Sequence, residues 1–437
     1  MAPLCCSSSP IFAFSFFSFF ASVFLVSGQR QLVLDSAEQD SLYEVLHSIN
    51  PSIPWRSIFP DDFCSSAPHG VVCDDFSNQS DAVSSQPDSV HVTELSFGYV
   101  SDYSDNPPCS PNSTLNPLIF TSFKYLRKIF FYKCFTETPA SLPNIPSGFG
   151  SSLEELVFIE NPALIGPVDR IIGNFTNLRR LVLSGTGVSG NIPESVGDLV
   201  SLQEISLSRN RLSGGVPLNL TKLEKLRILD LSYNGLDRNV PVSIGNLTEL
   251  LKLDLSFNGF SGEIPDSLGR LQSLEFLDLS FNRFGNYGVP LFLADMPRLR
   301  DVYLSGNSLG GQIPRIWENL GGILGIGFSN MGLVGSIPAS MGMHLRNLCY
   351  LRLDNNKLEG QVPEELGLLK NANEINLENN NLSGRIPFSA QFRTRIGEKL
   401  KLSGNPGLCF DEKQNFPKKG NSRLEQFKLC NNTGIRG

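Results

Sequence analysis

The sequence contains few charged residues and few of the side chains from which catalytic and metal sites are built. Charged residues make up 18% of the chain, the formal net charge is −7 at pH 7, and there are 4 histidines in 437 residues. This balance leaves no strongly basic surface, which disfavours nucleic acid or an anionic membrane as the partner. We therefore expect no enzymatic activity, no bound metal and no cofactor. The histidines share no spacing typical of a metal site or of a nucleophile with its base: His47, His69, His91 and His344.

Only one long apolar run is present, and it lies at the start of the chain. Residues 1–28 contain no charged side chain, include the apolar stretch 11–26, and end in the small residues Ser27 and Gly28. This pattern is typical of a secretory signal peptide cleaved after Gly28. An N-terminal membrane anchor is the alternative, and it needs about 20 apolar residues. Because segment 410–437 is polar and offers no hydrophobic tail for a lipid anchor, we expect a secreted chain without a direct membrane span.

Cysteine is sparse, and no Cys-x-x-Cys sequence occurs, which disfavours a zinc site. Two of the 9 cysteines, Cys5 and Cys6, lie in the expected signal peptide. Cys349 is left over and is expected to be a half-buried thiol within a strand. The other six form plausible pairs near the two ends of the chain, and in an oxidising compartment they predict three disulfides: Cys64–Cys73, Cys109–Cys134 and Cys409–Cys430.

Potential glycosylation sites also fit a secreted protein. The sequence Asn-x-Ser/Thr is the acceptor for N-linked glycans, although a chain rich in asparagine and serine produces some copies by chance. We expect glycosylation among the asparagines of these sequences, which are Asn78, Asn112, Asn174, Asn219, Asn246, Asn381 and Asn431.

A repeat of 24 or 25 residues governs the remainder of the chain. The pattern LxxIxLxxNxLxGxVP, found at residues 202–217, begins again at Leu226, Leu250 and Leu274. Such regularity is the sequence signature of a stacked-repeat architecture. In successive repeats the position of the asparagine is occupied by Asn161, Thr186, Asn210, Asn234, Asn258, Asn282, Asn307, Met331, Asn356, Asn380 and Asn405.

Each position of the repeat has a physical role. Alternating apolar residues such as Leu253 and Leu255 predict a short strand with one face inward, and Asp254 between them points outward. The asparagine that follows is expected to be buried, where its amide bonds the backbone of neighbouring coils. Gly262 and Pro265 then turn and stiffen the chain. Because one coil cannot bury its leucines alone, stacked coils must share a core and be capped at both ends.

These features predict a division into four segments. The N-terminal cap is expected to be helical, because Ser36 and Gln39 resemble a capping box and an apolar helical face follows them. The repeats should supply about 12–13 coils. The segments are a signal peptide at 1–28, an N-terminal helical cap at 29–90, repeats at 91–405, and a C-terminal cap with a polar tail at 406–437.

Several sequences resemble a known family. The turn LSGRIP at residues 382–387 resembles the plant-specific class of leucine-rich repeats in receptor kinases and receptor-like proteins. Proteins related to TOO MANY MOUTHS are similar at segments 91–98, 107–109, 113–115 and 130–134. The Piriformospora indica-insensitive protein 2 group of plant receptor-like proteins is similar along nearly the whole chain, including segments 60–62, 285–290 and 375–381. The resemblance implies an α/β repeat fold: a right-handed leucine-rich-repeat solenoid with a parallel concave β-sheet and disulfide-stapled caps.

The resemblance also implies a function. It points to an extracellular receptor-like protein without a kinase, located in the apoplast or at the outer face of the plasma membrane. Its partner would be a protein, namely a receptor kinase ectodomain, a peptide ligand or both. The process would be signalling in response to microbes, such as a symbiotic root fungus, or in development. The alternative is a secreted inhibitor of a microbial cell-wall-degrading enzyme, similar to the inhibitors of polygalacturonase.

The repeats that start at Leu226, Leu250, Leu274 and Leu299 carry the candidate binding residues. Aromatic residues and arginine dominate protein-binding hot spots. The alternative is that the rings simply pack on one another. A column of carboxylates, Asp230, Asp254 and Asp278, also points outward, but Leu-Asp-Leu-Ser is an ordinary strand sequence in this repeat class, so we expect no calcium site there. The expected outward residues are Tyr233, Phe257 and Phe281 in one column, with Lys252, Phe276, Arg300 and Tyr303 in neighbouring columns.

Overall fold

The computed structural model describes residues 33–66, 70–76, 89–99, 106–145, 152–172, 175–410 and 427–430. Several expectations therefore concern residues outside the described part of the chain. They are the signal peptide, His69, most of the polar C-terminal tail and three of the potential glycosylation sites, Asn78, Asn174 and Asn431. Of the remaining sites, Asn112, Asn246 and Asn381 are exposed and Asn219 is half-buried.

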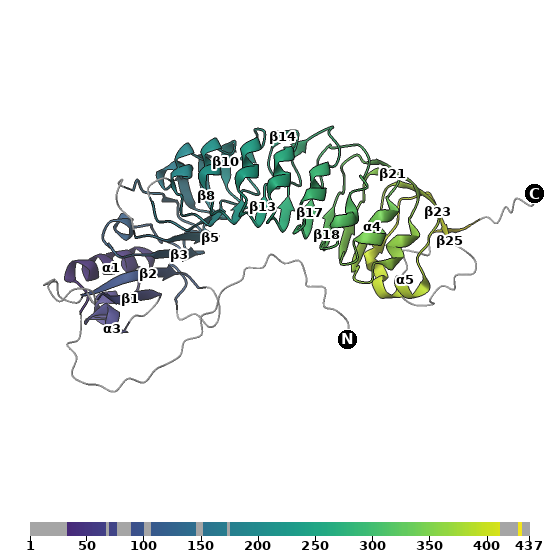
Figure 1. Ribbon diagram of the computed structural model, residues 1–437. Coiled ribbons are helices and arrows are strands. Elements are labelled where there is room, and N and C mark those ends of the chain that lie inside the picture. The colour runs from purple at the N-terminus through teal and green to yellow at the C-terminus, as the bar shows by residue number, and fades with distance from the viewer. Residues whose placement is uncertain are drawn as a thin grey trace, which may run out of the picture.

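The described chain winds into an arc whose inner face is a 14-stranded sheet (Figure 1). The first two strands pair antiparallel, and every later pair is parallel and one coil apart. The strands in spatial order are β1 (Val71–Phe76), β2 (Ser89–Phe97), β3 (Lys128–Tyr132), β5 (Glu155–Ile159), β7 (Arg180–Ser184), β9 (Glu204–Ser206), β11 (Ile228–Asp230), β13 (Lys252–Asp254), β15 (Phe276–Asp278), β17 (Asp301–Tyr303), β18 (Gly325–Gly327), β20 (Tyr350–Arg352), β22 (Glu374–Asn376) and β24 (Leu400–Lys401).

Short strands on the flank of the coils form further parallel sheets. On this flank, no described strand lies between β16 and β19. The described residues there form only isolated bridges, Gly285 with Ser308 and Gln312 with Val334. This break coincides with the irregular segment 285–290. The flank strands are β4 (Ala140–Ser141), β6 (Leu164–Pro167), β8 (Gly187–Asn191), β10 (Arg211–Gly214), β12 (Gly235–Leu236), β14 (Ser261–Gly262), β16 (Arg283–Phe284), β19 (Val334–Gly335), β21 (Lys357–Gln361), β23 (Asn381–Arg385), β25 (Gly407–Phe410) and β26 (Lys428–Leu429).

Short helices cover the outer side of the coils. Most begin directly after the proline of the repeat, because the fixed φ of proline suits the start of a helix; Pro265, for example, has φ −64° before η6. These helices are η1 (Pro117–Phe120), η2 (Val168–Arg170), η3 (Glu194–Asp198), η4 (Leu218–Lys222), η5 (Val242–Asn246), η6 (Asp266–Arg270), η7 (Leu291–Asp295), η8 (Trp317–Asn319), α4 (Ala339–His344), η9 (Glu364–Leu368) and η10 (Gly397–Lys399).

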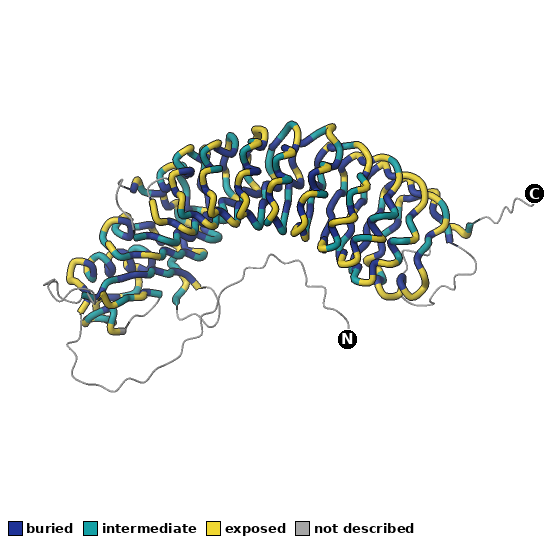
Figure 2. The backbone as a smooth tube through the Cα atoms, in the orientation of Figure 1, coloured by how far each residue is buried: buried dark blue, intermediate teal, exposed yellow. Residues whose placement is uncertain are grey.

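The core runs continuously between the inner sheet and the outer helices (Figure 2). The asparagine ladder expected at the end of each strand is present, and most of its side chains are buried, although Asn210, Asn234 and Asn258 are half-buried. Asn282 donates through Nδ2 to the carbonyls of Leu255 (2.9 Å) and Leu279 (3.0 Å), and its Oδ1 accepts from the Phe260 N–H (3.0 Å). Each ladder amide therefore ties its own coil to the preceding one. Where Met331 interrupts the ladder, Asn356 of the next coil accepts from its N–H (3.0 Å).

Helices α1 (Ser36–Ile49), α2 (Trp55–Ile58) and α3 (Phe63–Ser66) cover the N-terminal end of the core. The capping box expected from Ser36 and Gln39 is wrong. Asp35 caps α1 instead, because its carboxylate accepts from the N–H groups of Ala37 (3.0 Å) and Glu38 (3.2 Å). At the other end of the chain, α5 (Ala390–Ile396) replaces the short outer helix of the regular coils.

Disulfides join Cys64 to Cys73, Cys109 to Cys134 and Cys409 to Cys430, with Cα–Cα distances of 5.7, 4.8 and 5.0 Å. Two of them lie towards the N-terminal end of the solenoid and the third lies at its C-terminal end. Cys349 is buried and lies directly before β20, so the expectation that it is half-buried within a strand is wrong.

Candidate functional site

Strand register decides which side chains are neighbours on the inner face. Lys252 pairs with Phe276, which pairs with Asp301, and these residues form one outward column. Tyr303 falls in the next column, in line with Asp278. Arg300 precedes its strand and lies beside Glu275, 3.8 Å away from Nε to Oε2. The structure therefore brings Lys252, Phe276 and Tyr303 onto the sheet surface and leaves Arg300 at its edge.

Three stacked rings form an exposed apolar feature of the inner face. Tyr233 and Phe257 lie 4.1 Å apart between ring centroids, and Phe257 and Phe281 lie 4.3 Å apart. The three residues nevertheless remain 46%, 37% and 48% exposed. We call Tyr233, Phe257 and Phe281 the aromatic column. Its rings pack on one another and still face the solvent, so both properties anticipated for these rings are present at once.

The aromatic column has defined ends. The Arg209 guanidinium lies 5.8 Å from the centre of the Tyr233 ring. At the other end the next coil carries Gly306, and a Cβ added there would lie 2.6 Å from the Phe281 ring. The Phe281 ring therefore occupies the space that a side chain at Gly306 would fill, and the aromatic column ends at that coil.

A column of carboxylates runs beside the aromatic column. Lys252 Nζ lies 2.8 Å from Asp230 Oδ2 and 3.6 Å from Asp254 Oδ2. Burial opposes the charge of Lys252, but these two carboxylates outweigh it and raise its pKa. Asp278 accepts from the Ser280 N–H (2.8 Å), and burial together with the Asp254 charge raises the pKa of Asp278 to about 6. The raised pKa means that the negative charge of Asp278, in the middle of the candidate surface, is unfavourable in the folded chain.

Tyr303 is held in one orientation. Its hydroxyl donates to Asp301 Oδ1 (2.9 Å), and its ring lies 5.8 Å from Phe276. Burial raises the pKa of the Tyr303 hydroxyl, so it remains a hydrogen-bond donor. The following strand, β18, has Gly325 and Gly327 at its outward positions, and a Cβ on either would come within 2.7 Å of the Tyr303 side chain. Tyr303 thus occupies space that these glycines leave open.

Beyond β18 the inner face carries a second charged cluster, which sequence reasoning missed. Glu374 lies between two cations, 3.2 Å from Arg352 Nη2 and 3.1 Å from Lys401 Nζ. Burial raises the pKa of Glu374, but the two cations outweigh it and lower the pKa overall. Register alone could have indicated this cluster, since Arg352 and Lys401 fall in line with the Asp278 column.

The described residues hold no group of three or more histidine, cysteine, aspartate or glutamate side chains placed to bind a metal. In the same part of the chain, no helix has the length and apolar character needed to cross a bilayer.

Solved structures of plant receptors share this fold. The plant peptide hormone receptor RGFR1, in complex with RGF2, is 28% identical with a TM-score of 0.59, and the match covers 68% of this chain and 46% of that one. The crystal structure of PEPR1–AtPEP1 is 25% identical with a TM-score of 0.61, and the match covers 86% of this chain and 51% of that one.

Two Arabidopsis thaliana proteins are similar in sequence. Protein TOO MANY MOUTHS is 34% identical over 142 residues, which is 32% of this chain and 26% of that protein. Piriformospora indica-insensitive protein 2 is 34% identical over 167 residues, which is 38% of this chain and 36% of that protein. The matched region thus spans about a quarter to a third of these relatives' own length, and the resemblance to plant receptor-like proteins is confirmed.

The family model described as a leucine-rich repeat region matches residues 169–430, which is more than half of the chain. The 14-stranded inner sheet and the asparagine ladder are the structural counterparts of that match. The chain belongs to the leucine-rich repeat family.

Proposed function

We propose that this protein is an extracellular receptor-like protein that binds a peptide ligand, a receptor kinase ectodomain or both through its inner face. The observation that carries the proposal is the aromatic column, whose stacked rings stay in contact with solvent beside Phe276 and Tyr303. Exposed apolar patches of this kind mark protein-binding surfaces. Aromatic side chains held rigidly by their neighbours also lose little conformational entropy on binding.

The relatives support the proposal. Of the two solved structures described above, one is a plant peptide hormone receptor in complex with RGF2, and the other is PEPR1 with AtPEP1. Three disulfides in the described chain fit an oxidising compartment, so we place the protein in the apoplast or at the outer face of the plasma membrane. The similarity to Piriformospora indica-insensitive protein 2 supports a role in the response to root-colonising fungi.

The test begins with a pull-down from plant membranes, in which co-purifying receptor kinases are identified by mass spectrometry. The affinity of the purified kinase ectodomain is then measured for Phe257→Ala/Phe281→Ala and for Arg300→Ala/Tyr303→Ala. We expect each double variant to bind at least about tenfold more weakly while melting at a similar temperature. Leu291→Ala is the control, because Leu291 is also exposed and apolar but lies on the outer face in η7.

Two outcomes would contradict the proposal. Unchanged affinity in both double variants would move the contact away from the inner face. Inhibition of a fungal polygalacturonase by the wild-type chain, lost in the same variants, would instead identify the protein as an inhibitor of a wall-degrading enzyme.

A further inference from the structure

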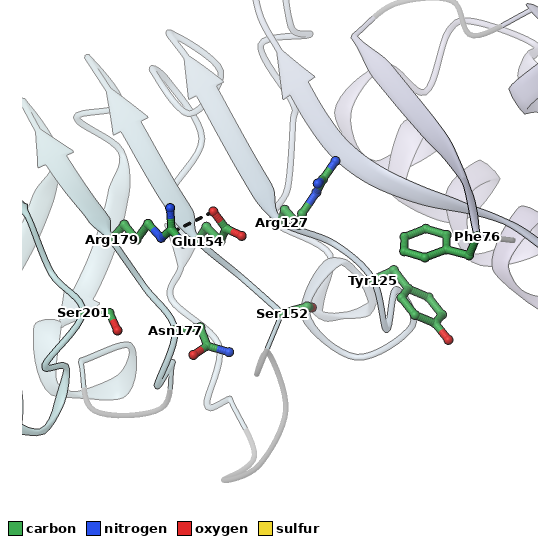
Figure 3. A pocket seen from close by; sticks show the side chains of 8 residues that line it. All are labelled: Phe76, Tyr125, Arg127, Ser152, Glu154, Asn177, Arg179 and Ser201. Atoms are coloured by element: carbon green, nitrogen blue, oxygen red, sulfur yellow. Dashed lines mark ion pairs between the residues drawn. The ribbon is translucent and has the colours of Figure 1, made fainter. Parts of the chain in front are cut away.

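A hollow lies at the edge of the inner sheet near its N-terminal end, and none of the candidate residues above lines it. Its volume is about 420 Å³, within the range of about 300–1,000 Å³ typical of small-ligand sites. Figure 3 shows its side chains in a row across consecutive coils, from Phe76 and Tyr125 at one end to Ser201 at the other. We call this hollow the rim groove.

The rim groove has a repeated lining, because the same two positions of successive coils face it. The residue before the first leucine of the repeat contributes Ser152, Asn177 and Ser201. The residue after that leucine contributes a second row, and neighbouring strands are about 4.8 Å apart. Hydroxyl, amide and charged groups therefore recur at regular intervals and suit an elongated ligand. The second row consists of Arg127, Glu154 and Arg179.

The charges of the rim groove cancel locally. Arg127 pairs with Asp74, and Arg179 Nε lies 3.7 Å from Glu154 Oε2 (Figure 3). A polyanion would meet the Glu154 carboxylate in the centre of the row, and a polycation would meet a guanidinium group on either side. This arrangement favours a neutral ligand with many groups that both donate and accept hydrogen bonds.

Aromatic side chains close the N-terminal end of the rim groove. The Tyr125 ring centroid lies 4.5 Å from that of Phe76 and 4.2 Å from that of His91, so the rings hold one another in place. Phe76 remains 36% exposed. An aromatic surface next to hydroxyl and amide groups matches a pyranose ring, which has an apolar face of C–H bonds and a rim of hydroxyls.

We propose that the rim groove binds a neutral, linear oligosaccharide. One sugar ring lies against Tyr125 and Phe76, and the following sugars hydrogen-bond to Ser152, Asn177 and Ser201. A protein partner fits less well, because protein hot spots need an apolar anchor in a desolvated centre and the centre of this groove is polar. The site goes beyond the proposed function, since it lies on earlier coils than the aromatic column and needs no contact with it.

The experiment uses the purified, secreted full chain and isothermal titration calorimetry. The probes are cellohexaose, xylohexaose and mannohexaose, with hexagalacturonate as the anionic counterpart. Ser201→Trp fills the groove, and Asn177→Ala removes one of its hydrogen-bonding groups. Ser273→Trp is the matched control, because Ser273 holds the same repeat position three coils further on and is also half-buried.

We expect at least one neutral hexasaccharide to bind, with affinity reduced at least about tenfold by Ser201→Trp and by Asn177→Ala and unchanged by Ser273→Trp. Thermal melting of each variant shows that it is folded. Binding of none of the neutral sugars, binding of hexagalacturonate alone, or an equal loss in Ser273→Trp would overturn the proposal. Capture of a kinase ectodomain by Ser201→Trp at wild-type affinity would show that the inner-face function stands independently.

Discussion

The side chain before each ladder asparagine projects from the inner face. Tyr233, Phe257 and Phe281 occupy this position with φ of 54–55°, the left-handed region that costs an ordinary residue about 1–2 kcal/mol. Later coils place asparagine there, which tolerates this geometry more easily: Asn330, Asn355 and Asn379. Bulky rings at such a position are locally unfavourable, and stacking within the aromatic column offsets part of the cost.

The ladder asparagines should be structural rather than ligand-binding. Asn282→Ala leaves the carbonyls of Leu255 and Leu279 and the Phe260 N–H without their side-chain partner. We expect the free energy of unfolding to fall by about 1–3 kcal/mol, with reduced secretion and unchanged affinity of the folded fraction. Thermal unfolding measures this, with the exposed Asn319→Ala as control. A variant that melted normally but lost its partner would contradict the assignment.

Asp278 should make stability depend on pH. Its pKa is about 6 in the folded chain and about 3.9 when unfolded. Between these values the folded chain binds more protons, so the free energy of unfolding falls as pH rises through this window. We expect Asp278→Asn to stabilise the protein at pH 7.5 by about 1 kcal/mol after allowance for solvent screening, and not at pH 3.5. Melting curves at both pH values test this.

Asp266→Asn is the matched control for that substitution, because Asp266 is an exposed aspartate on the outer helix η6. Destabilisation by Asp278→Asn at pH 7.5 but not at pH 3.5 would mean that the Asp278 charge supports the fold rather than opposing it.

At the scale of the element, strand β18 shows how a coil is adapted to its neighbour. Glycine is unfavourable in a strand because it loses the most conformational freedom on folding. In β18 two glycines nevertheless flank Ile326, and the space above them is filled by Tyr303 and Asp301 of the preceding strand. Strand β18 therefore has no outward side chains, which leaves room for those of β17.

Gly327→Ala should displace Tyr303. The new Cβ would lie 2.7 Å from Tyr303 Cδ1, so the ring must move. We expect a loss of about 1–3 kcal/mol in unfolding free energy, typical of overpacking, and weaker partner binding if Tyr303 contributes to it. Gly322→Ala serves as control, since its nearest neighbour would be 3.9 Å away. Equal stability of the two variants would show that the Tyr303 ring relaxes freely.

At the scale of the whole molecule, the solenoid is a one-dimensional stack in which the strands of the inner sheet pair only with those of neighbouring coils. Its middle coils are stabilised from both sides, whereas its ends depend on α1 to α3 at one end and on α5 and the Cys409–Cys430 disulfide at the other (Figure 1). A substitution that destabilises one end should therefore open the coils at that end and leave the middle coils folded.

The double variant Cys409→Ser/Cys430→Ser tests this locality. Loss of a native disulfide typically costs about 2–5 kcal/mol. We expect hydrogen exchange to quicken in β23 and β25, because the last coils open, and to stay unchanged in β11 and β13. Faster exchange throughout the chain would show instead that the stack unfolds as one cooperative unit.

The sequence by itself determined the coil, because the alternation of leucines, the ladder asparagine and the glycine–proline turn act within one repeat. It also determined which residues face outward, so Phe257, Phe281 and Lys252 were placed on the inner face from their positions alone. Only the tertiary structure decided what these residues meet. Stacking of the aromatic column, the pairing of Lys252 with Asp230 and the position of Tyr303 over Gly327 all join residues about one repeat apart.

The ends and edges of the stack also depended on tertiary structure. Asp35 rather than Ser36 caps α1, and the rim groove joins Phe76 of the N-terminal hairpin to Ser201 four coils later. A periodic pattern specifies contacts inside the repeat that carries it. It cannot specify contacts where the repeat is absent. It also cannot specify contacts between side chains at the same position of adjacent coils, because those contacts form only when the coils pack.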